Sequence, residues 1–124
     1  MSITNEQAEA TVRTYLGLVA TGTADEIAAL YAEDATLEDP VGSDPLHGRD
    51  AIRGFYATIE SLKITTELLT IRTAGGEAAF HFHISTDTGA GFAVMQPMEV
   101  MTFDEAGLIT TMRAWWNDGD LTFE

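Results

Sequence analysis

Asp39 is the residue whose type and position best suit it to remove a proton. It stands directly before Pro40, and the residue before a proline is restricted to extended backbone. Asp39 is therefore expected to end a short strand at the rim of whatever cavity the strand borders, where a carboxylate can act as a base. The alternative is a turn on a solvated loop, which is the commoner meaning of the dipeptide alone.

Tyr15 is a candidate hydrogen-bond donor. The spacing of Ala8, Val12, Tyr15 and Val19 places them on one face of a predicted helix. On that apolar face the ring of Tyr15 packs and its hydroxyl needs a partner. A core tyrosine with a satisfied hydroxyl is the alternative interpretation.

Glu99 is the polar residue of an otherwise apolar strand face. Alternation places it with Met95, Met101 and Phe103. Burial of a carboxyl raises its pKa, and a neutral carboxylic acid is a hydrogen-bond donor. Pro97 leaves a second possibility open, in which a bulge turns Glu99 toward solvent.

One base and two donors are the groups needed to move a proton alpha to a carbonyl. The carboxylate accepts the proton, and the donors stabilise the oxyanion that forms. This chemistry needs no metal and no cofactor. The sequence contains no glycine-rich phosphate loop, GxSxG motif or cysteine. His81 and His83 share a strand face but have no evident third ligand, so no metal site is predicted.

The elements before residue 62 are predicted to be mainly helical. Two capping boxes, at Thr4 with Gln7 and at Thr23 with Glu26, begin helices at about 5–20 and from 24 to near Tyr31. A short strand is expected at 35–39 and a loop at 41–47. Gly48 precedes a third helix at 49–61, with Phe55 and Tyr56 on its apolar face.

After residue 62 the apolar residues alternate, which predicts strands at 63–73, 77–87, 91–103 and 108–117. Helices followed by a meander indicate an α+β fold, a single domain over residues 1–124. Three N-terminal helices are expected to pack on a curved, mainly antiparallel sheet whose concave face holds the pocket.

The composition excludes several classes of partner. Twenty acidic residues against six basic ones give a formal charge of −14, which repels nucleic acids and anionic lipid surfaces. No apolar run approaches the ~20 residues of a membrane span. A neutral small molecule is the expected ligand. The absence of cysteine and of a signal-peptide pattern favours the cytoplasm.

Several segments resemble the ketosteroid isomerases (steroid delta-isomerases) of the NTF2-like, SnoaL-like superfamily. They are YAEDATLEDPVG, HGRDAIRGFY, VMTFDEAG and TMRAWW, and the resemblance extends from about Tyr15 to Trp116. It implies that Asp39 moves a proton from C4 to C6 of a 3-oxo-Δ5 steroid without a cofactor, giving the 3-oxo-Δ4 product. Tyr15 and the acid on the third strand, Glu99, would hold the dienolate oxygen.

The resemblance also implies roles for residues around these three. Tyr31 and Tyr56 would extend the hydrogen-bond chain behind the oxyanion hole. The residues expected to line the steroid cavity or flank the base are Phe55, Phe82, Met101, Met112 and Trp116, although the methionines and Trp116 are equally ordinary as core. The family forms a homodimer, and Trp115 with the two strand histidines faces away from the presumed cavity.

Two departures from the family pattern keep other functions open. The best-known isomerases have aspartate where this chain has Glu99, which shifts the carboxyl by ~1.5 Å, and Pro97 is the second departure. Both favour a protein that binds a steroid or another apolar ring system without converting it. A polyketide cyclase or an epoxide hydrolase is the further alternative. An epoxide hydrolase is expected to show an Asp-Arg-Asp set, whereas Arg113 projects away from the presumed pocket.

Overall fold

The N-terminal helices begin where the sequence predicts them. In the computed structural model, which describes residues 2–124, α1 spans Asn5–Thr21 and α2 spans Ala24–Ala28. Both have the predicted capping box: the N-cap threonine accepts a backbone N–H three residues on, and that residue's side chain accepts the threonine N–H. Helix α3, Arg49–Ala57, follows Gly48, whose positive φ of 91° suits glycine.

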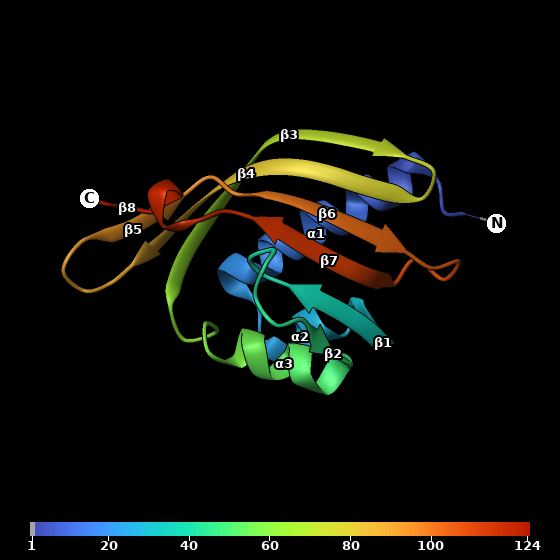
Figure 1. Ribbon diagram of the computed structural model, residues 1–124, viewed down its shortest axis with the longest axis horizontal. Coiled ribbons are helices and arrows are strands. Elements are labelled where there is room, and N and C mark those ends of the chain that lie inside the picture. The colour runs from blue at the N-terminus through green and yellow to red at the C-terminus, as the bar shows by residue number, and fades with distance from the viewer. Residues whose placement is uncertain (1) are drawn as a thin grey trace.

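The rest of the chain forms one curved mixed sheet (Figure 1). Its order is β2-β1-β7-β6-β4-β5-β8, and β3 pairs with the other edge of β4. Within residues 2–124, β1 with β7 is the one parallel pair. The strands are β1 Tyr31–Glu38, β2 Leu46–His47, β3 Lys63–Ala74, β4 Glu77–Asp87, β5 Phe92–Met95, β6 Met98–Phe103, β7 Ile109–Trp115 and β8 Thr122–Phe123.

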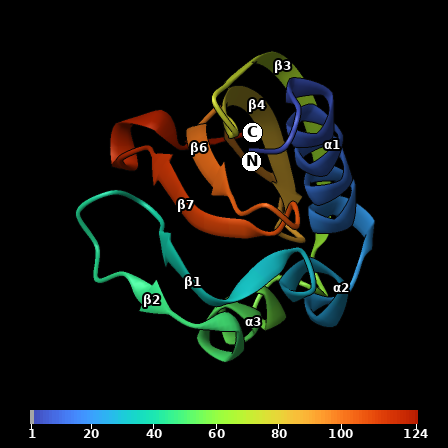
Figure 2. The same cartoon turned by 90° about the vertical axis from the view of Figure 1, so that its right-hand side faces the viewer.

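The helices cover the sheet unequally. The 17-residue α1 lies against β3 and β4, whereas α2 packs on α3, and α3 contacts β1 and β2. Figure 2 shows α1 along one side of the sheet and the two short helices together near β1. The predicted α+β class is confirmed. The picture of three N-terminal helices on the sheet is only partly right, because β1 and β2 separate α2 from α3 in the chain.

The predicted strand 91–103 is two strands, β5 and β6. Gln96 and Pro97 separate them, since a proline has no N–H to give to the ladder. The register is nevertheless unchanged across the break, with Ile84 opposite Met95 and His81 opposite Met98. Pro97 therefore interrupts the strand without turning the following residues over.

Short elements account for the other differences from prediction. Strand β1 begins at Tyr31 rather than at residue 35, and the predicted loop 41–47 contains β2. A 3-10 helix at Asp118–Asp120 and strand β8 follow β7, and β8 pairs with β5. Two-residue strands carry no periodicity that a sequence pattern could detect.

The core lies between α1, α3 and the inner face of the sheet. Its largest fully buried side chains include Tyr31, Tyr56 and Phe80. None of the helices in residues 2–124 is both long and apolar enough to span a bilayer.

Candidate active site

A cavity of about 190 Å³ is lined by the three residues predicted to transfer a proton. Asp39 enters it from the end of β1, Tyr15 from α1 and Glu99 from β6. Tyr56 is the fourth lining residue with an ionisable oxygen. The remaining lining residues are Val19, Phe55, Ile59, Phe82, Ile84, Met95, Pro97 and Trp116. The site is thus an apolar cavity with a small set of acidic oxygens.

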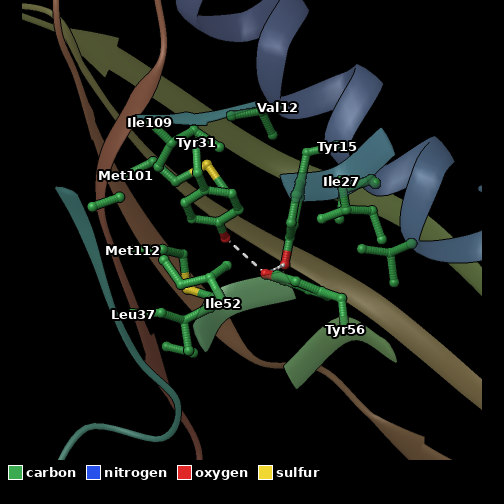
Figure 3. Close-up of a cluster of buried hydrophobic side chains, with 14 of the residues drawn as sticks. Val12, Tyr15, Ile27, Tyr31, Leu37, Ile52, Tyr56, Met101, Ile109 and Met112 are labelled. Atoms are coloured by element: carbon green, nitrogen blue, oxygen red, sulfur yellow. Dashed lines mark hydrogen bonds between the residues drawn. The ribbon is translucent and has the colours of Figure 1, made fainter. Parts of the chain in front are cut away.

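Three tyrosine hydroxyls form a buried chain (Figure 3). Tyr56 Oη lies 2.7 Å from Tyr31 Oη and 3.0 Å from Tyr15 Oη. Burial raises the pKa of all three hydroxyls well above the ordinary value, so they remain protonated. If Tyr31 donates to Tyr56 and Tyr56 to Tyr15, the Tyr15 proton is left to bond a ligand in the cavity.

The Asp39 carboxylate is held by an indole. Trp116 Nε1–H donates to Asp39 Oδ1 at 2.6 Å, which joins residues 77 positions apart in the chain. Burial raises the pKa of Asp39 above its ordinary value, and the Trp116 hydrogen bond opposes that rise. Asp39 is thus a partly desolvated carboxyl with a fixed orientation.

Glu99 lies on the inner face of the sheet, opposite Phe80. Only 4% of the residue is exposed, so a Pro97 bulge that turns it outward is excluded. Glu99 Oε1 is buried without a hydrogen-bond partner among the described residues. Burial, and then the charge of Asp39, raises the pKa of Glu99 well above its ordinary value. A protonated Glu99 can donate to a ligand oxygen.

Glu99 is expected to make stability depend on pH. In the unfolded chain its carboxyl titrates near 4.5, whereas in the folded protein its raised pKa keeps the proton bound to higher pH. The folded state therefore binds more protons above pH 4.5, and the free energy of unfolding falls as the pH rises toward the raised pKa. For one proton the folding equilibrium constant falls by at most about tenfold per pH unit.

Glu99→Gln should remove this pH dependence of the free energy of unfolding. The stability of the variant relative to wild type should therefore be greater at pH 8 than at pH 5. Urea unfolding at the two pH values measures the difference. Glu67→Gln, an exposed position on β3, is the matched control and should parallel the wild type. An equal difference at both pH values for Glu99→Gln would show that Glu99 ionises normally.

The structure places two of the predicted ligand-contacting residues elsewhere. Met101 and Met112 are fully buried opposite each other on β6 and β7, and neither lines the cavity. They pack in the cluster around Tyr31 in Figure 3. Strand alternation correctly places them on the inner face, but that face extends beyond the cavity into solid core.

Other lining residues were assigned to a face from the sequence but not to the binding site. Ile84 shares the strand face of Phe82, and Ile59 shares the predicted helix face of Phe55, so periodicity could have found both. Val19 and Met95 lie on the predicted faces of Tyr15 and Glu99. Whether they and Pro97 reach the cavity depends on how α1 and the β5–β6 break meet around it. Nothing local in the sequence specifies that arrangement.

No cluster of three or more His, Cys, Asp or Glu side chains suited to a metal occurs in residues 2–124. His81 and His83 are partly exposed on the outer face of β4, away from the cavity residues.

Comparison with known proteins identifies relatives over nearly the whole chain. A model of the SnoaL-like domain family matches residues 12–112. A Steroid Delta-isomerase of Nocardioides simplex is 51% identical over 115 residues, which cover 93% of this chain and 94% of that protein. The family-model match contains Tyr15, Asp39 and Glu99 and ends before Trp116.

Two solved structures share the fold. The epoxide hydrolase/cyclase-like enzyme SalBIII, described for pyran ring formation in the polyether salinomycin, has a TM-score of 0.88 at 26% identity and covers 96% of this chain and 97% of its own. RV0760c of Mycobacterium tuberculosis has a TM-score of 0.89 at 23% identity, covering 99% and 100%. The family match, the 51% identical relative and the shared fold together assign the chain to the SnoaL-like domain family of the NTF2-like superfamily, and within it to the ketosteroid isomerases.

Proposed function

We propose that this protein is a steroid delta-isomerase that converts 3-oxo-Δ5 steroids into 3-oxo-Δ4 steroids. The observation that carries the proposal is the meeting of Asp39, Tyr15 and Glu99 in one apolar cavity. An ionisable base and two protonated donors in a cavity lined mainly by apolar side chains suit a proton transfer through an enolate. The Steroid Delta-isomerase of Nocardioides simplex, 51% identical, supports the same activity.

In the proposed reaction the Asp39 carboxylate removes a proton from C4 of the steroid. The C–H electron pair forms the C3–C4 double bond of a dienolate, and negative charge moves to the C3 oxygen. Protonated Asp39 then returns the proton to C6, which leaves the conjugated enone and regenerates the carboxylate. No electron acceptor or cofactor enters this balance.

Tyr15 and protonated Glu99 form the proposed oxyanion hole. Both donors are buried, so little solvent has to reorganise around them when the charge develops on the oxygen. Tyr56 and Tyr31 support Tyr15 through their hydroxyl chain. The partner-free Oε1 of Glu99 fits a group whose hydrogen bond is made to the substrate rather than to the protein.

The cavity volume limits how the substrate is held. At about 190 Å³ it is smaller than the roughly 300–1,000 Å³ of most pockets for drug-sized ligands. A four-ring steroid therefore has to widen the cavity or extend beyond it. The reacting ring takes the inner end, beside Asp39 and the donors, because those groups act on it.

The position of Arg113 argues against an epoxide hydrolase with an Asp-Arg-Asp set. Arg113 donates to Glu38 and its side chain is 49% exposed, and it is absent from the cavity lining. No arginine or lysine lines the cavity among residues 2–124.

The proposal is tested by incubating the protein with a 3-oxo-Δ5 steroid and recording ultraviolet absorbance. The conjugated enone of the product absorbs where the substrate does not, so a growing band is the expected result. Tight binding of the steroid without a band would contradict the isomerase and favour a binding protein.

A homodimer is part of the proposal. Met98 and Trp115 face each other on the outer side of the sheet and are 55% and 42% exposed. A sheet face left without helices and carrying large apolar side chains suits burial against a second copy.

Sedimentation should give a dimer for the wild type and a monomer for Met98→Glu. Phe123→Glu, at another exposed apolar residue, should remain dimeric. A monomeric wild type would contradict the assembly.

A further inference from the structure

A single carboxylate on the outer side of the sheet ties together the backbone on both sides of Asp39. Glu38, the last residue of β1, lies opposite Arg113 of β7, and Arg113 Nε–H donates to Glu38 Oε1 at 2.9 Å. Glu38 Oε2 accepts the Gly42 N–H at 3.2 Å. Glu38 thus links the strand before Asp39, the turn after it and strand β7.

One further contact binds this segment to β7, and a second fixes Arg113 within β7. The Val41 N–H donates to the Ala114 carbonyl at 2.7 Å. The guanidinium carbon of Arg113 lies 4.9 Å from the ring centroid of Trp115, within cation–π range. Arg113 is therefore held in place as well as paired.

We propose that the Glu38–Arg113 ion pair positions the catalytic base, holding the Asp39 carboxylate in the place and charge state that proton transfer requires. The inference rests on the proposed function of Asp39. Its geometric part is that a displacement of about 1 Å in a reacting group can cost about 100-fold in rate. Its electrostatic part is that an unpaired Glu38 carboxylate would oppose the ionisation of its neighbour, and Arg113 neutralises it.

The other titratable groups around Asp39 do not carry the charge that Arg113 carries. Burial first of all, and in addition the charge of Asp39, raises the pKa of Glu99 on β6, Tyr15 on α1 and Tyr31 on β1, so all three stay protonated. These groups are neutral and do not offset the charge of Glu38, whereas Arg113 does. Loss of Arg113 therefore leaves the Glu38 carboxylate unpaired next to Asp39, which disfavours ionised Asp39.

Because the ion pair is partly exposed, breaking it should affect catalysis more than the free energy of unfolding. The Arg113 and Glu38 side chains are 49% and 21% exposed. Exposed ion pairs contribute little to global stability. A loss of function on breaking this pair is accordingly expected without a comparable loss of folded protein.

The test compares Arg113→Gln, with and without Glu38→Gln. Arg113→Gln should lower kcat by roughly tenfold and move the acid limb of the kcat/KM profile to higher pH, because Glu38 is left unpaired. The double variant should return the acid limb toward the wild-type pH, since the extra charge is gone, while kcat stays low. A merely structural role would not produce this reversal.

The matched control is Arg13→Gln on α1. Arg13 Nε lies 2.9 Å from Glu9 Oε2, and both side chains are largely exposed, 59% and 42%. The control has the same charge change and the same bond length as Arg113→Gln but does not touch the Asp39 segment. It should leave kcat and the pH profile unchanged.

The outcomes separate this inference from the proposed function. An active wild type with an unaltered Arg113→Gln, or a variant that changes KM or stability alone, would overturn the positioning role. An inactive wild type would count against the isomerase instead. In that case a ¹³C NMR titration of the Asp39 carboxyl still decides: a higher pKa in Arg113→Gln supports the ion pair's role, and an unchanged pKa overturns it.

Discussion

Asp39→Asn is expected to lower kcat for 3-oxo-Δ5 steroids by about 1,000-fold or more. An amide of nearly the same shape cannot take the C4 proton, but its oxygen can still accept the Trp116 N–H that holds Asp39. The cavity should therefore keep its form. Enone absorbance measures kcat, and calorimetry with a phenolic steroid measures binding, which should be unchanged or tighter because a negative charge is removed.

Asp44→Asn is the control for this prediction. Asp44 is an exposed carboxylate on the same connection between β1 and β2, so the same chemical change is made outside the cavity. It should retain wild-type activity. An Asp39→Asn protein that keeps more than about a tenth of wild-type activity would show that another group removes the proton.

Glu99→Ala is expected to lower kcat by about 100- to 1,000-fold, the usual cost of removing one donor from an oxyanion hole. Glu99→Gln should retain roughly tenfold more activity than the alanine variant, because its amide N–H can still donate to the dienolate oxygen. Steady-state kinetics on the two variants gives the comparison. The KM should change less than kcat, since the bond strengthens as the oxygen gains charge.

Glu67→Ala and Glu67→Gln provide the same pair of changes at an exposed position on β3. Both should behave like the wild type. Equal losses in Glu99→Ala and Glu99→Gln would rule out the donor role.

The sequence predicts the helices and the strand faces well because these depend on local patterns. The Thr4 and Thr23 capping boxes form as predicted, and Val12 and Tyr15 lie on the buried face of α1. The identity of Asp39, Tyr15 and Glu99 as cavity residues also follows from type, pattern and resemblance taken together.

The sequence does not predict the contacts between residues that are far apart in the chain. The burial of Glu99 depends on whether Pro97 shifts the register, and only the pairing of β4 with both β5 and β6 decides that. The hydrogen bond from Trp116 to Asp39 joins the residues that follow β1 and β7. Those two strand ends lie side by side because β1 and β7 pair in parallel. Likewise, strand alternation places Met101 on the inner face of the sheet, but it does not show how far the cavity extends along that face.

Trp116 also gives the cavity an optical reporter of its own. The chain has two tryptophans, and the other, Trp115, is 42% exposed on the outer face. In a Trp115→Phe variant, where an aromatic ring still stacks on Arg113, Trp116 would be the one indole emitter. Because that indole donates to Asp39 and lines the cavity, its fluorescence should follow both the charge of the base and the arrival of a ligand. Occupancy and protonation could then be read from unlabelled protein in a single spectrum.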